Sequence, residues 1–141
     1  MQPLTKIRVF QFRLAVILLT IYWIAMFTGT HLPKMGIINV HVNDKVKHFI
    51  GFFGLTFLLC YVSGGEHLWR RFARVVGIIL TYALFDEWTQ GFVPGRTPDP
   101  MDFLADALGM FAAIGMYLAA RRFFHKPILR MLSRVRGLTP G

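Results

Sequence analysis

Six of the seven acidic residues of this chain lie inside, or at the edges of, segments apolar enough to cross a membrane. They are Asp44, Asp86, Glu87, Asp99, Asp102 and Asp106. A carboxylate in such a segment costs free energy unless it meets a partner or lines a water-filled cavity, so acids in these places mark functional sites. We therefore expect them to serve a site for proton transfer or for binding a polar ligand.

Polar residues on three predicted helices are spaced so that each pair shares one helix face, because residues three or four apart lie on the same side. The pairs are Asp44 with His48, Glu87 with Gln90, and Asp102 with Asp106. We expect Glu87 and Asp106 to lie about 9 Å from the ends of their helices, since six residues rise by that distance. The spacing predicts one shallow polar layer formed by three helices.

Each acid also has a structural interpretation. Asp99 and Asp102 could cap a helix that begins at Pro100, and Asn43 or Asp44 could cap another. The more deeply placed polar residues could instead hydrogen-bond the helices together. We expect Arg96, in a Pro-Gly-Arg turn, to neutralise Glu87 or Asp102 or to bind an anionic ligand.

Other chemistries have weaker support. One histidine with several carboxylates could hold a metal ion, but the chain has no His-x-x-x-His or cysteine pair, so we expect no metal or cofactor. No serine or cysteine nucleophile with a partnered base occurs in this layer, and Cys60 suits a buried apolar position. There is no phosphate-binding glycine loop.

The composition is that of an integral membrane protein. Hydrophobic residues make up 55% of the chain and charged residues 16%, whereas soluble domains average about a quarter charged. The net charge of +9 does not indicate nucleic-acid binding, because the basic residues flank apolar runs. Membrane topology accounts for them.

Four apolar segments are long enough to span a bilayer. They are residues 14–30, 46–63, 72–93 and 101–120. The first could be a signal peptide, but no small-residue cleavage pattern follows it, so we interpret it as an anchor. In the fourth, Ala105, Gly109 and Ala113 form a stripe of small residues that would let another helix approach closely.

The basic residues predict the orientation of these spans. If the amino terminus is cytoplasmic, twelve of the 16 Lys and Arg residues lie on the inner side and four on the outer side. Short loops with this bias follow the positive-inside rule, so both termini should be cytoplasmic and the polar layer should face outward.

The predicted organisation is a cytoplasmic arm (1–13), a four-span domain (14–120) and a basic tail (121–141). In the tail, Arg122, Lys126, Arg130 and Arg134 recur every four residues. This pattern is typical of an amphipathic helix on the anionic inner leaflet, and equally of a frayed tail that serves only the positive-inside rule.

Three strings in the polar layer resemble those of VanZ-like membrane proteins. The strings begin at Asp44 (DKVKHF), Asp86 (DEWTQGFVPGR) and Asp102 (DFLADALG), and the resemblance covers residues 44–120. It implies a cell-envelope protein related to one that confers low-level resistance to teicoplanin, and it implies no established reaction. The family pattern favours Asn where this chain has Asp106.

We predict an all-α, four-span bundle in the cell membrane that binds or modifies a polar or amphiphilic envelope component. The candidate catalytic residues are Glu87 or Asp102 as general base and His48 as the acid partner. The candidate binding residues are Asp44, Lys45, Asp86, Gln90, Arg96 and Asp106. Alternatively, the protein is non-catalytic and the polar layer only holds the helices together.

Overall fold

The computed structural model describes residues 8–9, 12–32, 43–64 and 67–136. Four helices dominate it: α2 (Leu14–Thr30), α3 (Asp44–Val62), α4 (Leu68–Gln90) and α5 (Pro100–Arg136). Two short antiparallel strands, β1 (Arg8–Val9) and β2 (Phe12–Arg13), precede them, with Arg8 opposite Arg13. Apart from this strand pair, the described residues form the all-α fold that the sequence predicts.

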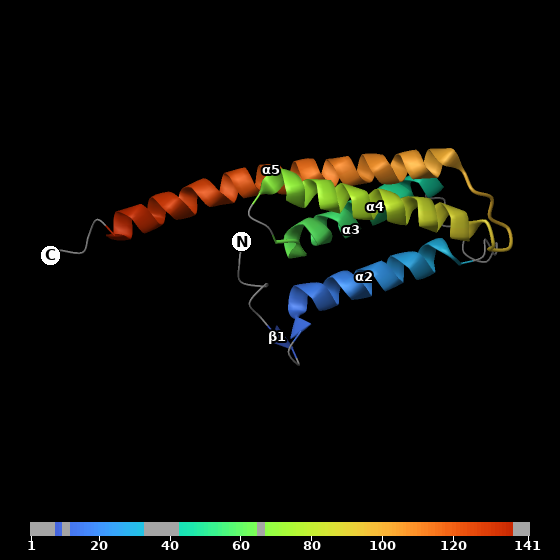
Figure 1. Cartoon of the computed structure of the whole chain (residues 1–141), viewed down its shortest axis with the longest axis horizontal. Coiled ribbons are helices and arrows are strands. Elements are labelled where there is room, and N and C mark those ends of the chain that lie inside the picture. Colours follow the sequence, from blue (N-terminus) through green and yellow to red (C-terminus); the bar gives the residue numbers. More distant parts are fainter. Residues whose placement is uncertain (1–7, 10–11, 33–42, 65–66, 137–141) are drawn as a thin grey trace.

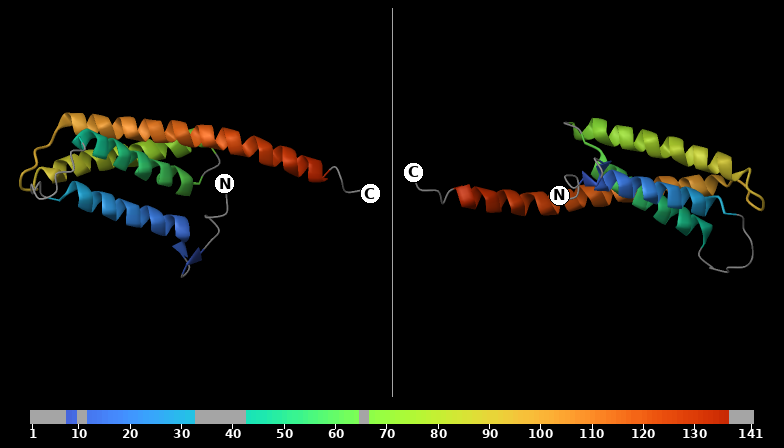
Figure 2. Two further views of the ribbon diagram at one scale, coloured as in Figure 1. Left: turned by 180° about the vertical axis from the view of Figure 1, so that it is seen from behind. Right: turned by 90° about the horizontal axis from the view of Figure 1, so that it is seen from below.

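Each of the four helices runs antiparallel to the next helix in the chain, so the helix ends that carry the polar residues lie together (Figure 1). The end of α2, the start of α3, the end of α4 and the start of α5 lie together at one end of the bundle, and the two other views agree (Figure 2). We call this the polar end. The strand pair lies toward the opposite end, and α5 continues beyond the bundle on that side.

Side-chain caps set where two helices begin at the polar end. Asn43 accepts a hydrogen bond from the backbone N–H of Lys45 (3.1 Å), so Asn43 and not Asp44 caps α3. Asp99 accepts one from the backbone N–H of Met101 (2.9 Å), and Pro100 takes the first helical position of α5. The predicted capping role of Asp99 is confirmed.

The bounds of α4 and α5 differ from the predicted spans. Helix α4 ends at Gln90 instead of residue 93, because the chain turns through Gly91–Gly95 and Gly95 adopts a positive φ of 79°. Glu87 therefore lies one turn from its helix end and not nearly two. Helix α5 continues through residue 120, the predicted end of the fourth span, to Arg136.

Small residues allow the helices to approach closely. Helices α3 and α5 form the most extensive contact in the bundle. A Cβ atom at Gly109 would meet the backbone carbonyl of Phe49 and lie 3.1 Å from the backbone nitrogen of Phe53. Ala105 and Ala113 are also buried, so the small-residue stripe of the sequence lies at this contact. On the other side of α3, Gly54 accommodates the ring of Tyr22 from α2.

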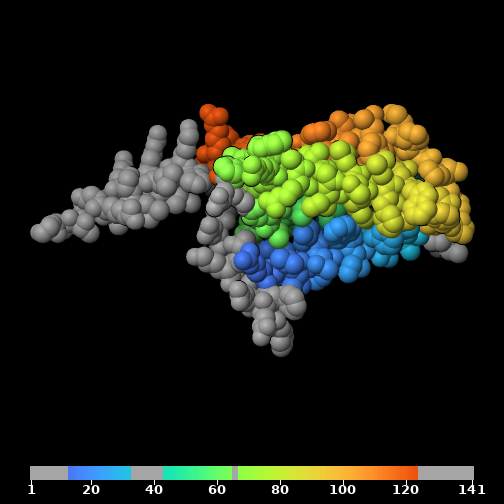
Figure 3. Space-filling model, viewed as in Figure 1, coloured from blue at the N-terminus to red at the C-terminus, as the bar shows by residue number. Residues whose placement is uncertain are grey.

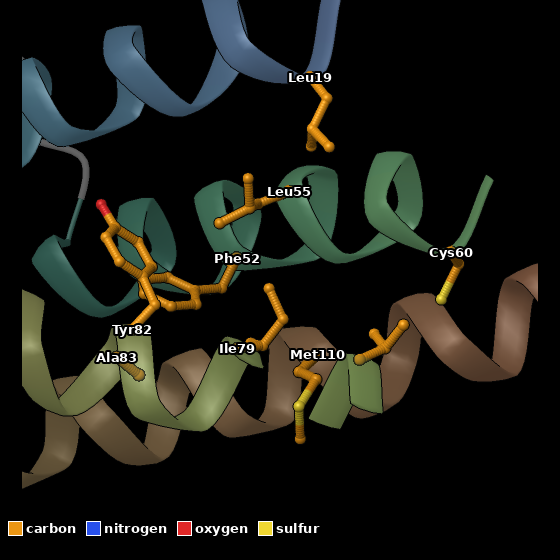
Figure 4. Packing of buried hydrophobic residues seen from close by; sticks show 9 residues of the cluster. Leu19, Phe52, Leu55, Cys60, Ile79, Tyr82, Ala83 and Met110 are labelled. Carbon is orange, nitrogen blue, oxygen red and sulfur yellow. The ribbon is translucent and has the colours of Figure 1, made fainter. Parts of the chain in front are cut away.

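The apolar core lies between the helices, below the polar end. Phe52 of α3 stacks on Tyr82 of α4 with ring centroids 5.6 Å apart, and Met110 of α5 is fully buried in the same cluster (Figure 4). The space-filling view shows α4 lying between α5 and α2 on one face (Figure 3). This packing fixes the rotation of each helix and hence the side chains that meet at the polar end.

Two helices are long and apolar enough to cross a membrane, namely α3 and the part of α5 from Pro100 to Phe123. Helix α2 is apolar but has only 17 residues. Helix α4 has 23 residues but carries Arg70, Arg71, Arg74, Asp86 and Glu87, which lower its hydropathy. By length and composition, two helices among the described residues are therefore candidate membrane spans.

Candidate functional site

A histidine and a carboxylate form the innermost contact of the polar end. His48 of α3 and Asp106 of α5 are both buried, and the His48 Nδ1 atom lies 3.0 Å from Asp106 Oδ1. The carboxylate accepts a hydrogen bond, so in the neutral imidazole Nδ1 carries the proton and Nε2 presents a lone pair. Asp106 therefore orients the ring and fixes which nitrogen is available.

The available nitrogen faces two further carboxylates. His48 Nε2 lies 3.9 Å from Asp102 Oδ2, and one ligand atom from each of His48, Glu87 and Asp102 lies within 4.8 Å of the others. Glu87 Oε2 accepts the backbone N–H of Asp99 (3.0 Å), whereas Glu87 Oε1 and His48 Nε2 are buried without a hydrogen-bond partner. We call His48, Glu87 and Asp102 the central triad.

Lysine and aspartate side chains form the rim beside the triad. Lys45 Nζ donates to Asp99 Oδ2 (2.6 Å) and to Asp102 Oδ1 (3.1 Å). The Lys45 ammonium, helped by the backbone N–H of Met101, holds the pKa of Asp99 below its usual value. This rim contact links α3 to the start of α5 and leaves Asp102 Oδ2 directed to His48.

A second cluster surrounds Asp86, which is fully buried. One carboxylate oxygen accepts from the Thr30 hydroxyl (3.0 Å) and the Tyr82 hydroxyl (3.3 Å), and the other accepts from Gln90 Nε2 (2.5 Å). His31 Nδ1 lies 3.9 Å from the same carboxylate. In contrast to Glu87, its neighbour in the chain, Asp86 has both oxygens satisfied by protein donors.

Arg96 belongs to the Asp86 side of the polar end. Its Nη1 donates to Gln90 Oε1 (3.1 Å), its Nε donates to the Leu32 carbonyl (3.3 Å), and its Nη1 lies 3.8 Å from Asp44 Oδ2. We expected Arg96 either to neutralise Glu87 or Asp102 or to bind an anionic ligand. The first role was wrong, and the second stays a prediction. The turn at Gly95 directs the guanidinium toward α2 and the start of α3 instead.

The structure brings all nine predicted site residues to one end of the bundle and divides them into groups. His48, Glu87, Asp102 and Asp106, with Lys45 at the rim, make the first. The second contains Asp86 and Gln90, with Arg96 and Asp44 beyond them. Thr30, His31 and Tyr82 were not among the predicted site residues. The signal for Thr30 and His31 was a Thr-His pair at the end of the first apolar run, on the same side as the three strings.

The triad has the elements of an acid–base centre. A buried carboxylate orients the imidazole, the free imidazole nitrogen can accept or donate a proton, and the free Glu87 oxygen can act as a base. In the same arrangement one nitrogen and two carboxylate oxygens could hold a metal ion, which no spacing in the sequence indicated. Both chemistries require a ligand that reaches the triad.

Comparisons with known proteins agree with the motif strings and extend the match. A family model described as VanZ/LLP1 matches residues 2–124. An uncharacterized protein of Schizosaccharomyces pombe is 31% identical over 121 residues, which cover 84% of this chain and 68% of that protein. No solved structure matches the chain at a significant level.

Proposed function

This chain belongs to the VanZ/LLP1 family, and we propose that it is a four-span membrane protein whose outward-facing triad binds or modifies a polar group of a cell-envelope component. One observation carries this proposal. His48 Nε2 and Glu87 Oε1 come from two different helices, are buried, and have no hydrogen-bond partner in the protein.

Unpartnered atoms of this kind favour a ligand site over a structural contact. A buried polar group without a partner costs about 1–3 kcal/mol, and more if it is charged. A contact that served only to hold helices together would lower that cost by pairing its members, as the Asp86 cluster does. The triad keeps the cost, which is characteristic of groups that wait for a substrate or ligand.

The membrane setting is supported by the outer surface of the bundle. Large apolar side chains are exposed on all four helices, including Ile24, Ile50, Leu84 and Phe111. In each of the two apolar helices 28% of the most hydropathic window is buried, whereas the core helix of a soluble protein would be mostly buried. A lipid environment would cover these surfaces, and the distribution of Lys and Arg would place the polar end outside.

Two residue roles follow for a catalytic form of this proposal. Glu87 would take a proton from the ligand through Oε1, and His48, once protonated at both ring nitrogens and held by Asp106, would return one from Nε2. Arg96 has five N–H donors and uses two of them on Gln90 and Leu32, so it retains donors for an anionic group. A binding form would use the same atoms without proton transfer.

The alternative is that the polar layer only joins the helices. The Asp86 cluster favours it, because this carboxylate connects α2 and α4 through hydrogen bonds and leaves no oxygen free. The ion pair of Lys45 with Asp99 and Asp102 connects α3 and α5 in the same way. We assign the structural role to these two contacts and the ligand role to the triad.

The tail extends the proposal to the inner face. Helix α5 continues to Arg136, and its last turns contain the basic residues spaced by four. We propose that this segment binds anionic lipid headgroups. Each Lys or Arg near such a surface contributes about 1 kcal/mol, so replacing Lys126, Arg130 and Arg134 with Gln should weaken binding to anionic vesicles and leave binding to neutral vesicles unchanged.

The test of the proposed function uses cells. We expect the parent chain, expressed in a susceptible bacterium, to change tolerance to teicoplanin or a related lipoglycopeptide. Glu87→Gln and His48→Ala should reach the membrane at parental levels and lose the effect. Glu66→Gln makes the same chemical change in the one acid outside the six and should keep it. If both triad variants retain the effect at equal expression, the triad is structural.

Orientation is tested separately with reporter fusions. Fusions after Gly65 and after Arg136 should report a cytoplasmic location, and a fusion after Pro98 an external one. An external signal after Arg136 would contradict the four-span arrangement.

A further inference from the structure

One ligand atom from each of three side chains at the polar end lies close to the other two. The ligand atoms of His48, Glu87 and Asp102 lie within 4.8 Å of one another, and these residues are 2%, 8% and 6% exposed. Two of the three side chains contribute an atom that has no hydrogen-bond partner, His48 Nε2 and Glu87 Oε1. His48 Nε2 and Glu87 Oε1 each lack a partner, and the ligand atoms of the three residues lie close enough for one ion to bind all three.

The charge around these atoms calls for a cation. Three carboxylates surround the imidazole, those of Glu87, Asp102 and Asp106. Among the described residues only Lys45 supplies an ion pair from a basic side chain, to Asp102, while Arg96 and Lys47 are directed to Asp44. With Asp102 paired to Lys45, the carboxylates of Glu87 and Asp106 have no basic side chain beside them other than His48 among the described residues. In a low-dielectric environment, a divalent ion would balance their charge.

We propose that His48 Nε2, Glu87 and Asp102 bind a divalent transition-metal ion, with Asp106 as the positioning residue behind the histidine. One imidazole nitrogen with two carboxylate oxygens suits Zn²⁺ or Mn²⁺, whereas Mg²⁺ and Ca²⁺ prefer oxygen alone. Three protein ligands leave at least one coordination position open, as in catalytic metal sites. That position would take water or an oxygen of the bound ligand.

The contact between Asp106 and His48 is what such a site requires behind its histidine. A metal-binding histidine usually donates its other ring N–H to a carboxylate or carbonyl, which fixes the tautomer and the ring plane. Here that distance is 3.0 Å and both residues are buried. A histidine that only joined the helices would not need a free Nε2. The hydrogen bond at Nδ1 and the free Nε2 together therefore favour a metal ligand over a structural histidine.

The distances between the three ligand atoms are slightly longer than those in an occupied metal site. Atoms bound at about 2.0–2.2 Å in a tetrahedral site are separated by about 3.3–3.6 Å. The distance from His48 Nε2 to Asp102 Oδ2 is 3.9 Å, and all three separations are within 4.8 Å. We expect a rotation of the Glu87 side chain and a small shift of Asp102 to close this gap, because Glu87 is held only through Oε2 and Asp102 only through Oδ1.

The test is metal binding by the untagged full-length chain in detergent. After treatment with EDTA and exchange into metal-free buffer, the protein is titrated with Zn²⁺ and with Mn²⁺, and the bound metal is counted by mass spectrometry. We expect one ion per chain and little retention of Mg²⁺. His48→Ala, Glu87→Gln and Asp102→Asn should each raise the Kd by at least about 100-fold.

Three further variants separate the triad from its surroundings. Asp99→Asn removes a neighbouring carboxylate that is not a ligand, keeps the helix cap, and should change the Kd by less than about threefold. Asp106→Leu removes the acceptor behind His48 and should raise the Kd by about 10–100-fold. Asp106→Asn keeps an acceptor for the Nδ1 proton and should recover most of that loss.

A spectroscopic measurement keeps the proposal open to refutation if the triad variants fold poorly. Pulsed EPR of the Mn²⁺-loaded parent should detect one imidazole nitrogen bound to the metal. Less than stoichiometric metal in the parent, no nitrogen coupling, or folded triad variants that bind as tightly as Asp99→Asn would each overturn the site.

Metal binding and the proposed envelope function can fail independently. Metal bound at the triad with no change in drug tolerance would reject the function and keep the site. Loss of the cellular effect in Glu87→Gln with no metal in the parent would do the reverse.

Discussion

At the end of the bundle opposite the triad, a buried arginine meets neutral oxygens, whereas at the polar end a buried histidine meets an excess of carboxylates. The Nη2 atom of Arg71 in α4 donates to the Cys60 carbonyl and to the Tyr117 hydroxyl (2.7 Å), while its Nε is buried without a hydrogen-bond partner. Cys60 lies in the last turn of α3, where the helix dipole is negative and favours a cation.

The comparison distinguishes a buried charge with a structural role, that of Arg71, from buried charges that we assign to a ligand site, those of the central triad. Arg71 joins three helices by donating to groups that would otherwise be unsatisfied, so protein groups compensate most of the cost of its burial. The triad is compensated only in part, because Asp106 pairs with His48 Nδ1 and Lys45 with Asp102 Oδ1, while His48 Nε2 and Glu87 Oε1 have no partner. Removing the Arg71 guanidinium should therefore reduce stability, whereas removing a side chain of the central triad should reduce ligand binding.

The largest effect on stability is expected at Arg71. Arg71→Met keeps most of the side-chain volume but leaves the Cys60 carbonyl and the Tyr117 hydroxyl without their donor. We expect the free energy of unfolding to fall by about 2–4 kcal/mol, measured by denaturant titration in mixed micelles. Arg70→Met is the matched control, because Arg70 is exposed on the same helix and should change it by no more than about 0.5 kcal/mol. Equal effects would contradict the structural role of Arg71.

A smaller effect is expected behind the triad. Asp106→Leu leaves the buried Nδ1–H of His48 without an acceptor, whereas Asp106→Asn keeps an acceptor and removes a negative charge. We therefore expect the Leu variant to be less stable than the Asn variant by about 1–3 kcal/mol, and the Asn variant to stay within about 1 kcal/mol of the parent. A Leu variant as stable as the Asn variant would show that the contact with His48 does not orient the ring.

The smallest effect is expected at the rim. Asp99→Asn retains the cap on α5 but removes the ion pair with Lys45. The side chain of Lys45 is 39% exposed and that of Asp99 is 43% exposed, so solvent screens this ion pair. Because the folded pKa of Asp99 lies below 3.8, the ion pair stabilises the fold above that pH and is lost as pH falls through the folded pKa. We expect the melting temperatures of parent and variant to differ slightly at neutral pH and to converge in acid. A difference that persisted in strong acid would have another cause.

Much of the helix arrangement could be predicted from local patterns. The apolar runs placed all four helices, Asp99-Pro100 placed the start of α5, and the small-residue stripe placed the contact around Gly109. These features depend on neighbouring residues or on one helix face. The end of α4 could not be predicted in the same way, because it depends on a turn in which Gly95 has a positive φ.

The membership of the polar end could be predicted, but its pairings could not. Spacing by three and four put His48, Glu87, Asp102 and Asp106 on suitable faces, and the resemblance to VanZ-like proteins singled out the same strings. Which side chains touch depends on the rotation of each helix about its axis, and that is set by core packing around Phe52 and Tyr82. For this reason Arg96 was paired with the wrong acids, and Thr30 and His31 were missed.

Asp86 and Glu87 allow the central claim to be tested most directly, because they are adjacent, buried acids with opposite degrees of hydrogen bonding. We would measure the free energy of unfolding of Asp86→Asn and Glu87→Gln beside the parent, in metal-free detergent buffer. The account predicts a loss of about 1–3 kcal/mol for Asp86→Asn, because the new amide cannot accept from all of Thr30, Tyr82 and Gln90. It predicts that Glu87→Gln is as stable as the parent or more stable, because an uncompensated carboxylate is removed. If Glu87→Gln were destabilised as much as Asp86→Asn, the triad would be structural and the ligand site would not exist.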